Sequence, residues 1–292
     1  MLLWPDTFTN FLQPEVAKAA VAVLEHAGYE VRLPDRVLCC GRPLYDFGML
    51  TLAKRLLAQM LDELRPAVRA GLPVVGLEPS CLSVFRDELT NLFPDDEDAR
   101  RLAKQTFTLA ELLVEQTSGY RPPRLPGRAL VHGHCHQKAI VGMAADLVLL
   151  ERMELRAELV DAGCCGMAGP FGFEAGHYPT SQAIGERVLL PRVRAADADT
   201  LVLADGFSCA TMVAQGTGRR PLHFAEVIQL GLREAQPLPE PASLGRSRPR
   251  RGRAVIVGAG GVALLAAGRR VQRHVLRRAA VAGHHGSVRT QM

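Results

Sequence analysis

The hydrophobic pattern in the first half of the chain alternates short apolar runs with longer amphipathic segments. Short apolar runs bounded by turn residues are typical of buried strands, whereas apolar positions three and four apart are typical of helices. Pro14 at the first helical position and Gly28 just past the end indicate a helix at 14–26. In chain order, the pattern predicts a strand at 2–4, that helix, a strand at 29–33, a turn at 39–41, a helix at 50–68 and a strand at 73–77.

The second half repeats this order. It predicts a strand at 129–132, a helix at 140–153, a strand at 157–160, a turn at 164–166, a helix at 181–193 and a strand at 200–204. A cysteine pair and a single cysteine recur at matched intervals, 41 residues from Cys40 to Cys81 and 44 from Cys165 to Cys209. Strands that alternate with helices favour an α/β fold, here two tandem pseudo-repeated units with small, mostly parallel sheets. We expect domains at 1–118 and 128–235, followed by a Pro- and Arg-rich tail at 236–292 whose composition predicts disorder.

Each of the seven cysteines falls at a predicted strand end or turn, and none falls inside a predicted helix. An odd number that contains two adjacent pairs makes a poor disulfide framework, because adjacent cysteines bridge each other only with strain. Thiolate ligands in a reducing cytoplasm fit better. The carboxyl ends of strands meet at one edge of an α/β sheet, which brings such side chains together. The cysteines are Cys39, Cys40, Cys81, Cys135, Cys164, Cys165 and Cys209.

Iron–sulfur clusters are held by deprotonated cysteines, usually four. The second half supplies four, which suffice for one [4Fe-4S] cluster, and the first half supplies three. The position that matches Cys135 falls near Asp6–Thr7 in the first half. We therefore expect a complete ligand set in the second unit and a defective one in the first, with a site shared between the units as an alternative.

Three segments carry a family resemblance: Cys39-Cys40-Gly41-Arg42-Pro43-Leu44-Tyr45-Asp46, Gly76-Leu77-Glu78-Pro79-Ser80-Cys81 and Cys164-Cys165-Gly166-Met167-Ala168-Gly169. Over residues 1–233 the chain resembles the CCG domains in the cysteine-rich subunit of heterodisulfide reductase. It also resembles the iron–sulfur subunits of glycolate, lactate and glycerol-3-phosphate dehydrogenases, and the C-terminal part of FAD-linked oxidases. Where these relatives have a further cysteine at the end of each unit, this chain has Glu78 and Gly206, so we expect an ordinary [4Fe-4S] cluster.

The resemblance implies an oxidoreductase that transfers electrons and works with partners. No segment resembles a flavin site, and the closely spaced cysteines of ferredoxins are absent from the sequence. We expect FAD on a flavin-binding dehydrogenase subunit, a ferredoxin-like domain as a further partner, and a 2-hydroxy acid of the glycolate or lactate type as substrate. The resemblance favours His132 and His136 as hydrogen-bonding neighbours of the cluster, and a merely structural histidine is the alternative. No residue is assigned a catalytic role.

Charge separates the body of the chain from its tail. The net charge is +5, but eleven arginines follow position 245, and without them 24 basic residues face 30 acidic ones. The basic balance is therefore no sign of nucleic-acid binding. The N-terminus shows no signal peptide, so we expect a cytoplasmic protein. An apolar run at 254–268 is too short to span a bilayer, but flanking arginines leave contact with a membrane surface open beside a poorly ordered tail.

Three other interpretations of the cysteines remain. They could be free buried thiols, since cysteine behaves as a small hydrophobic residue. They could bind zinc in an interaction module, although the usual Cys-x-x-Cys pairs are absent from the sequence. They could also form a thiol-based disulfide reductase of the heterodisulfide reductase type. For Glu78, an oxygen ligand and a helix-capping carboxylate are both open.

Overall fold

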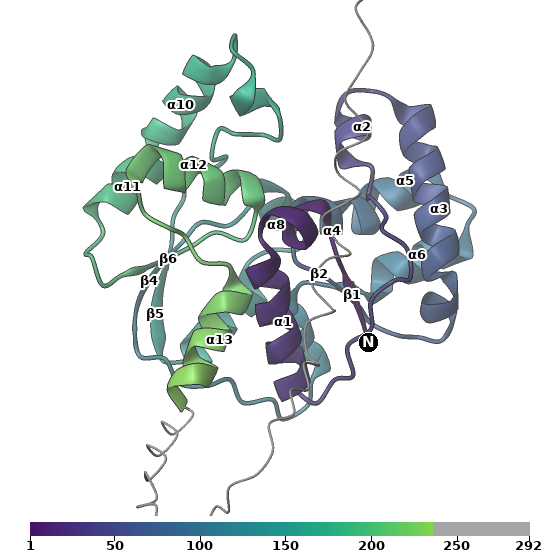
Figure 1. Ribbon diagram of the computed structural model, residues 1–292, viewed down its shortest axis with the longest axis horizontal. Coiled ribbons are helices and arrows are strands. Elements are labelled where there is room, and N and C mark those ends of the chain that lie inside the picture. Colours follow the sequence, from purple (N-terminus) through teal and green to yellow (C-terminus); the bar gives the residue numbers. More distant parts are fainter. Residues whose placement is uncertain (236–292) are drawn as a thin grey trace, which may run out of the picture. The chain divides into compact units, whose positions relative to one another are not determined.

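Two three-stranded parallel sheets organise the chain in a computed structural model that describes residues 1–235. Each sheet lies in a different half of the sequence (Figure 1). The strands are β1 (Leu2–Trp4), β2 (Val74–Gly76) and β3 (Thr106–Phe107), in that order, and then β4 (Gly127–Val131), β5 (Leu155–Leu159) and β6 (Leu201–Leu203), in the order β5-β4-β6. The predicted α/β fold with parallel sheets is confirmed. We call residues 1–118 module one and residues 128–235 module two, with the domain boundaries themselves remaining a prediction.

Helices surround both sheets. Module one has α1 (Pro14–His26), α2 (Arg42–Asp46), α3 (Leu50–Arg69), α4 (Pro79–Ser83), α5 (Leu89–Leu92), α6 (Glu97–Gln105) and α7 (Leu109–Glu111), with π-helical turns at Phe8–Leu12, Val84–Glu88 and Leu112–Gln116. Module two has α8 (Cys135–Ile140), α9 (Ala144–Arg152), a 3₁₀ turn at Phe171–Phe173, α10 (Tyr178–Arg187), α11 (Leu189–Ala195), α12 (Phe207–Thr217) and α13 (Phe224–Ala235).

The two best-defined helix predictions are confirmed. One strand prediction and one further helix prediction are wrong. Helix α1 has the predicted bounds, and α3 ends one residue later than expected. The predicted strand at 29–33 forms only an isolated bridge between Leu2 and Arg32. The predicted helix at 181–193 is instead two helices that meet at Val188. Pro191 explains this break, because its ring clashes with the carbonyl four residues back and it has no N–H to donate.

A shared hydrophobic core joins the two modules. It contains Leu3 of β1 and Val131 of β4, and it includes residues of α1 and α13, two helices that lie side by side (Figure 1). Two further clusters lie in one module each, around Trp4 and Phe85 in module one and around Val202 in module two. The sheet edges that carry the cysteines are therefore fixed relative to each other by apolar packing between α1 and α13.

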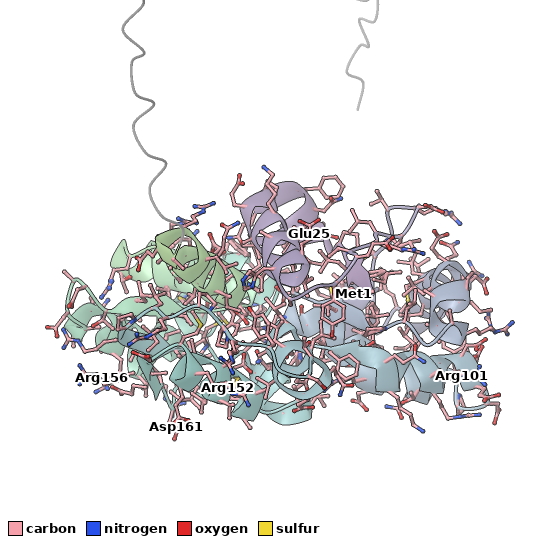
Figure 2. The ribbon with its side chains drawn as sticks, turned by 90° about the horizontal axis from the view of Figure 1, so that it is seen from below. Met1, Glu25, Arg101, Arg152, Arg156 and Asp161 are labelled. Atoms are coloured by element: carbon pink, nitrogen blue, oxygen red, sulfur yellow. The ribbon has the colours of Figure 1, made fainter. Side chains whose placement is uncertain are left out.

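Charged side chains cover the outside of this core. Figure 2 shows Glu25, Arg101 and Arg152 at the periphery. No helix within residues 1–235 is long and apolar enough to cross a membrane. The predicted tail at 236–292, with its apolar run and the expected membrane contact, lies outside the described residues.

Candidate metal centre

The cysteines of module two gather at the carboxyl edge of its sheet. Cys135 follows β4 as the first residue of α8, the pair Cys164 and Cys165 lies in the loop after β5, and Cys209 lies in the first turn of α12 after β6. The equivalent loops of module one place Cys39 and Cys40 before α2 and Cys81 in α4. Two comparable groups of sulfur atoms result, one in each module.

The expectation that no cysteine lies in a helix is wrong for Cys81, Cys135 and Cys209. In each case the strand runs through a short turn directly into a helix. The helices begin so early because a polar side chain satisfies the first N–H groups of α4 and α8. Glu78 accepts from the N–H of Ser80 in α4, and His134 accepts from the N–H of His136 in α8.

The four thiols of module two form a connected set. Cys135 contacts Cys164, Cys164 contacts Cys165, and Cys165 contacts Cys209. The ligand atoms of Cys165, Cys209 and the buried His132 all lie within 4.8 Å of one another. The Cys164 sulfur accepts from the N–H of Gly166 at 3.3 Å. This arrangement can hold a metal ion or, with all four sulfurs, an iron–sulfur cluster.

Charge in this set is unevenly distributed. Contacts with the thiols of Cys135 and Cys165 lower the pKa of Cys164, and the N–H of Gly166 adds to that effect. Contact with Cys165 also lowers the pKa of Cys209, with His132 contributing. The pKa values of Cys135 and Cys165 are raised, mainly by their contacts with Cys164. The shifts differ in direction because neighbouring thiols compete for the same protons, so the four groups titrate as one coupled set.

Two glycines allow the segments that carry the cysteines to pack closely on their neighbours. Gly166, at φ +96°, lies so close to α10 that an added Cβ would be 2.3 Å from the carbonyl oxygen of Ser181. A Cβ on Gly206 would be 2.3 Å from Cδ2 of His134. Any larger residue at either position would force the backbone or the His134 ring to move. Gly166 thus fixes the loop of Cys164 and Cys165 on α10, and Gly206 fixes the start of α12 on His134.

Three histidines surround Cys135 in different ways. His132 is 3% exposed, and within the described residues neither of its ring nitrogens has a hydrogen-bond partner. His136 also has an unpartnered Nδ1, and burial together with the nearby Arg42 lowers its pKa to about 4. His134, which the sequence did not single out, caps α8 and packs on Gly206. The signal available in the sequence was its position directly before Cys135, the first residue of α8.

Module one holds three thiols in a similar place. The Cys40 thiol donates to the Cys81 sulfur at 3.0 Å, and Cys39 accepts from the N–H of Gly41 at 3.4 Å, as Cys164 does from Gly166. Contact with Cys40 and burial raise the pKa of Cys39. The pKa values of Cys40 and Cys81 are raised too, since contacts with neighbouring thiols that lower them are outweighed by burial and other nearby groups. Burial is a cause common to all three shifts.

Glu78 connects the two modules. It is 4% exposed, and its second oxygen accepts from the N–H of Phe207 at 2.9 Å, at the start of α12. The same carboxylate thus caps the helix that carries Cys81 and the helix that carries Cys209. Phe207 also stacks on Phe8 with ring centroids 4.4 Å apart. Of the two roles left open for Glu78, the structure shows the helix-capping one.

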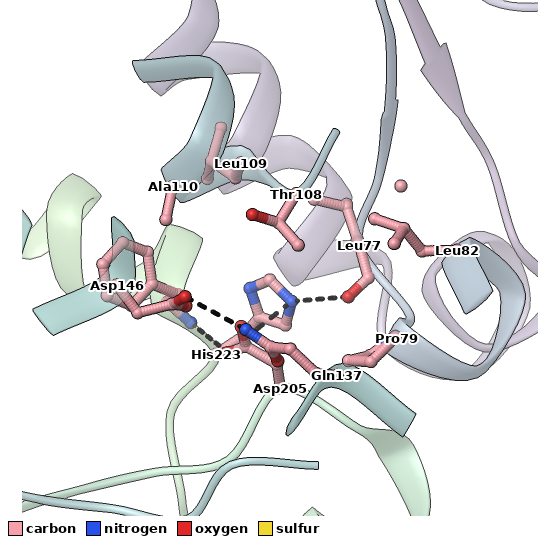
Figure 3. A pocket seen from close by; sticks show the side chains of 12 residues that line it. Leu77, Pro79, Leu82, Thr108, Leu109, Ala110, Gln137, Asp146, Asp205 and His223 are labelled. Carbon is pink, nitrogen blue, oxygen red and sulfur yellow. Dashed lines mark hydrogen bonds and ion pairs between the residues drawn. The ribbon is translucent and has the colours of Figure 1, made fainter. Parts of the chain in front are cut away.

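A second polar contact between the modules lies beside a small pocket (Figure 3). His223, before α13, accepts from the N–H of Ala225 through Nδ1, so its Nε2–H donates to the carbonyl of Leu77 at 3.1 Å. Asp146 accepts from Gln137 at 3.1 Å beside a cavity of about 10 Å³, room for about one water molecule. Burial, with Asp205 nearby, raises the pKa of Asp146 to about 8.

Comparisons with known proteins agree with this geometry. A family model for the cysteine-rich CCG domain matches residues 7–86. The chain is 31% identical over 221 residues to the C subunit of anaerobic glycerol-3-phosphate dehydrogenase from Escherichia coli K12, with 74% of the chain and 55% of the relative covered. It is 31% identical over 247 residues to lactate utilization protein A of Bacillus velezensis, covering 77% and 97%.

A third relative is much longer. D-2-hydroxyglutarate dehydrogenase of Pseudomonas putida is 28% identical over 230 residues, which cover 78% of the chain and 22% of that protein. The chain spans about half the length of its glycerol-3-phosphate dehydrogenase relative and nearly all of lactate utilization protein A. The repeated cysteine sites and these similarities lead to one conclusion. The chain belongs to the cysteine-rich CCG-domain family of iron–sulfur oxidoreductases.

Proposed function

We propose that the chain is the electron-transfer component of a flavin-dependent dehydrogenase and binds a [4Fe-4S] cluster through Cys135, Cys164, Cys165 and Cys209. The observation that carries this proposal is the convergence of the four cysteines on the carboxyl edge of one sheet, where the ligand atoms of Cys165, Cys209 and His132 lie within 4.8 Å of one another. When bound, such a cluster supplies one-electron transfer.

The surrounding residues have distinct tasks in this proposal. His132 offers a buried ring nitrogen beside Cys165 and Cys209, where an N–H donor to sulfur would raise the reduction potential. Burial lowers the pKa of His136 to about 4, so its ring is neutral at pH 7. The N–H of Gly166 stabilises negative charge on Cys164. Cys165 and Cys209 are 3% and 1% exposed, so this protein side of the site excludes water.

The partner and substrate follow from the names of the relatives. These concern glycerol-3-phosphate, lactate and D-2-hydroxyglutarate, each of which carries a hydroxyl group on carbon. Oxidation of a C–OH group by a flavin releases two electrons together, whereas a cluster passes them one at a time. We therefore propose a partner that binds FAD and oxidises a 2-hydroxy acid, a ferredoxin-like partner domain, and a cytoplasmic location.

Metal analysis of the full chain, purified without oxygen, tests the proposal. We expect iron and acid-labile sulfide in equal amounts, and a C209S variant should lose the iron of module two. An A210S variant is the matched control, because it places a hydroxyl beside Cys209 without removing a sulfur. A chain that contains neither iron nor sulfide contradicts the proposal.

Zinc is the second candidate, and one observation favours it. The ligand atoms of His132, Cys165 and Cys209 are close enough to share a single ion. Zinc would make module two a colourless structural site without electron transfer. Zinc in place of iron, lost on substitution of His132 by Ala, would establish this alternative.

A further inference from the structure

The sulfur site of module one matches that of module two position by position, with two residues exchanged. Trp4 pairs with Gly76 in the first sheet, and Gly76 lies five residues before Cys81. In the second sheet His132 follows directly after the pair Val131–Leu203, at the level of Ala204, which lies five residues before Cys209. Trp4 therefore occupies the place of His132, and counting three residues on from each puts Thr7 in the place of Cys135.

The contacts agree with this register. The Thr7 side chain lies beside the Cys39 thiol, as Cys135 lies beside Cys164. The carboxylate of Asp6 accepts from the N–H groups of Phe8 and Thr9, as His134 accepts from that of His136. Module one thus presents three sulfurs and one hydroxyl at the four positions where module two presents four sulfurs.

Burial divides these four positions into an inner and an outer side. Cys40 is 3% and Cys81 7% exposed, Cys39 is partly exposed, and Thr7 is exposed. The position without sulfur is therefore the one that faces solvent. A metal held here would have thiolates on the protein side and an outer coordination position that water or another small ligand can reach.

An unused hydrogen-bond donor lies on the inner side. Trp4 is 1% exposed, and its indole N–H has no partner among residues 1–235. Trp4 belongs to the same buried cluster as Cys40 and Cys81. A buried N–H without an acceptor costs free energy. Module one thus has a buried, unpartnered nitrogen at the position where module two has the unpartnered ring of His132.

We propose that Thr7, Cys39, Cys40 and Cys81 form a second cluster site, in which three cysteines hold three irons and the fourth iron, at Thr7, is exchangeable. This inference rests on the proposed function, since it extends cluster binding to module one. Mild oxidation releases the exchangeable iron. A four-iron cluster in its 2+ state then gives a three-iron cluster in its 1+ state, Fe²⁺ and one electron, which ferricyanide accepts.

Adding the missing sulfur tests the proposal in the full chain. The anaerobically purified protein is treated with ferricyanide while a chelator records Fe²⁺ and EPR records the three-iron cluster. The unsubstituted chain is expected to release one iron and to show the three-iron signal, whereas T7C should keep its iron and show no signal. N10C, which places a cysteine on a nearby exposed residue, should behave as the unsubstituted chain does. Thr7 is exposed, so the substitution leaves the core intact.

Two further variants assign the signal to a module. C40S should abolish it, and C209S should leave it in place. A signal that persists in T7C or in C40S, or its absence from the unsubstituted chain, overturns the inference, as does a Cys40–Cys81 disulfide found by peptide mass mapping. If C209S alone removes the signal, the exchangeable iron belongs to module two and only this inference fails. An iron-free chain contradicts the proposed function as well.

Discussion

The two modules share a framework of strands, loops and helix starts, yet their sulfur sites differ in chemistry. Module two brings four cysteines and a buried histidine to its sheet edge, whereas module one brings three cysteines and a buried tryptophan. The replaced positions are few: Thr7 stands for Cys135 and Trp4 for His132. The comparison teaches that the sheet edge determines where ligands meet, while single residues decide how many sulfurs meet there.

Removing one buried sulfur from each module gives the largest expected effect. C209S breaks the four-sulfur set and should remove all the iron bound in module two, because serine is a poor ligand for a cluster that needs thiolates. C81S should leave module two fully loaded. Iron counting on both variants checks this. If C81S empties module two as well, the two sites are not independent.

The exchanged residues Trp4 and His132 differ in what they contribute to stability. Trp4 packs edge-on against Phe85 with centroids 4.9 Å apart in a fully buried cluster. W4A should lower the free energy of unfolding by about 3–5 kcal/mol, the usual cost of removing a large buried aromatic side chain. H132A should cost clearly less, because the His132 ring makes no hydrogen bond within the described residues. Urea denaturation measures both, and equal losses would contradict the comparison.

Asp146, buried in module two, makes the stability of the protein depend on pH. Its pKa is raised from an ordinary 3.8 to about 8, so the folded protein holds a proton that the unfolded chain releases. This contribution to stability is fully present below about pH 4 and is lost as the pH rises through about 8. Its size is on the order of a few kcal/mol.

D146N should remove this dependence and make the protein more stable at pH 8. The neighbouring Asp205 and Glu111 face the same group and remain ionisable in the variant. Unfolding by urea at several pH values measures the slope. D62N, at an exposed residue of α3, is the control. Equal slopes in D146N and in the unsubstituted chain would show that Asp146 does not retain its proton.

Glu78 should have the smallest of these effects. E78A removes the caps of α4 and α12 together and leaves two partly buried N–H groups without partners, a loss of about 2 kcal/mol. E78Q keeps an acceptor oxygen and should lose less. E25Q, on the exposed face of α1, serves as the control. A smaller loss for E78A than for E25Q, measured by thermal unfolding, would contradict a capping role.

The sequence predicted those parts of the fold that depend on local signals. Pro14 and Gly28 mark both ends of α1, and the repeated cysteine pairs indicated two α/β units. Local signals failed where distant contacts decide the outcome. Residues 29–33 have strand-like composition, but only Arg32 pairs with a neighbour, at Leu2.

The candidate site shows the same division. The cysteine positions could be predicted, because strand ends converge in an α/β fold. The caps could not be, since Glu78 meets Phe207 across 129 positions of the chain. The match between Thr7 and Cys135 could be placed only approximately until the strand register was known.

Iron and acid-labile sulfide in the full chain, purified without oxygen and compared with its C164S variant, test the central claim most directly. The account predicts a brown protein with equal iron and sulfide, and a C164S variant that loses the iron of module two. A colourless, iron-free chain, or a C164S variant with unchanged iron, would contradict it.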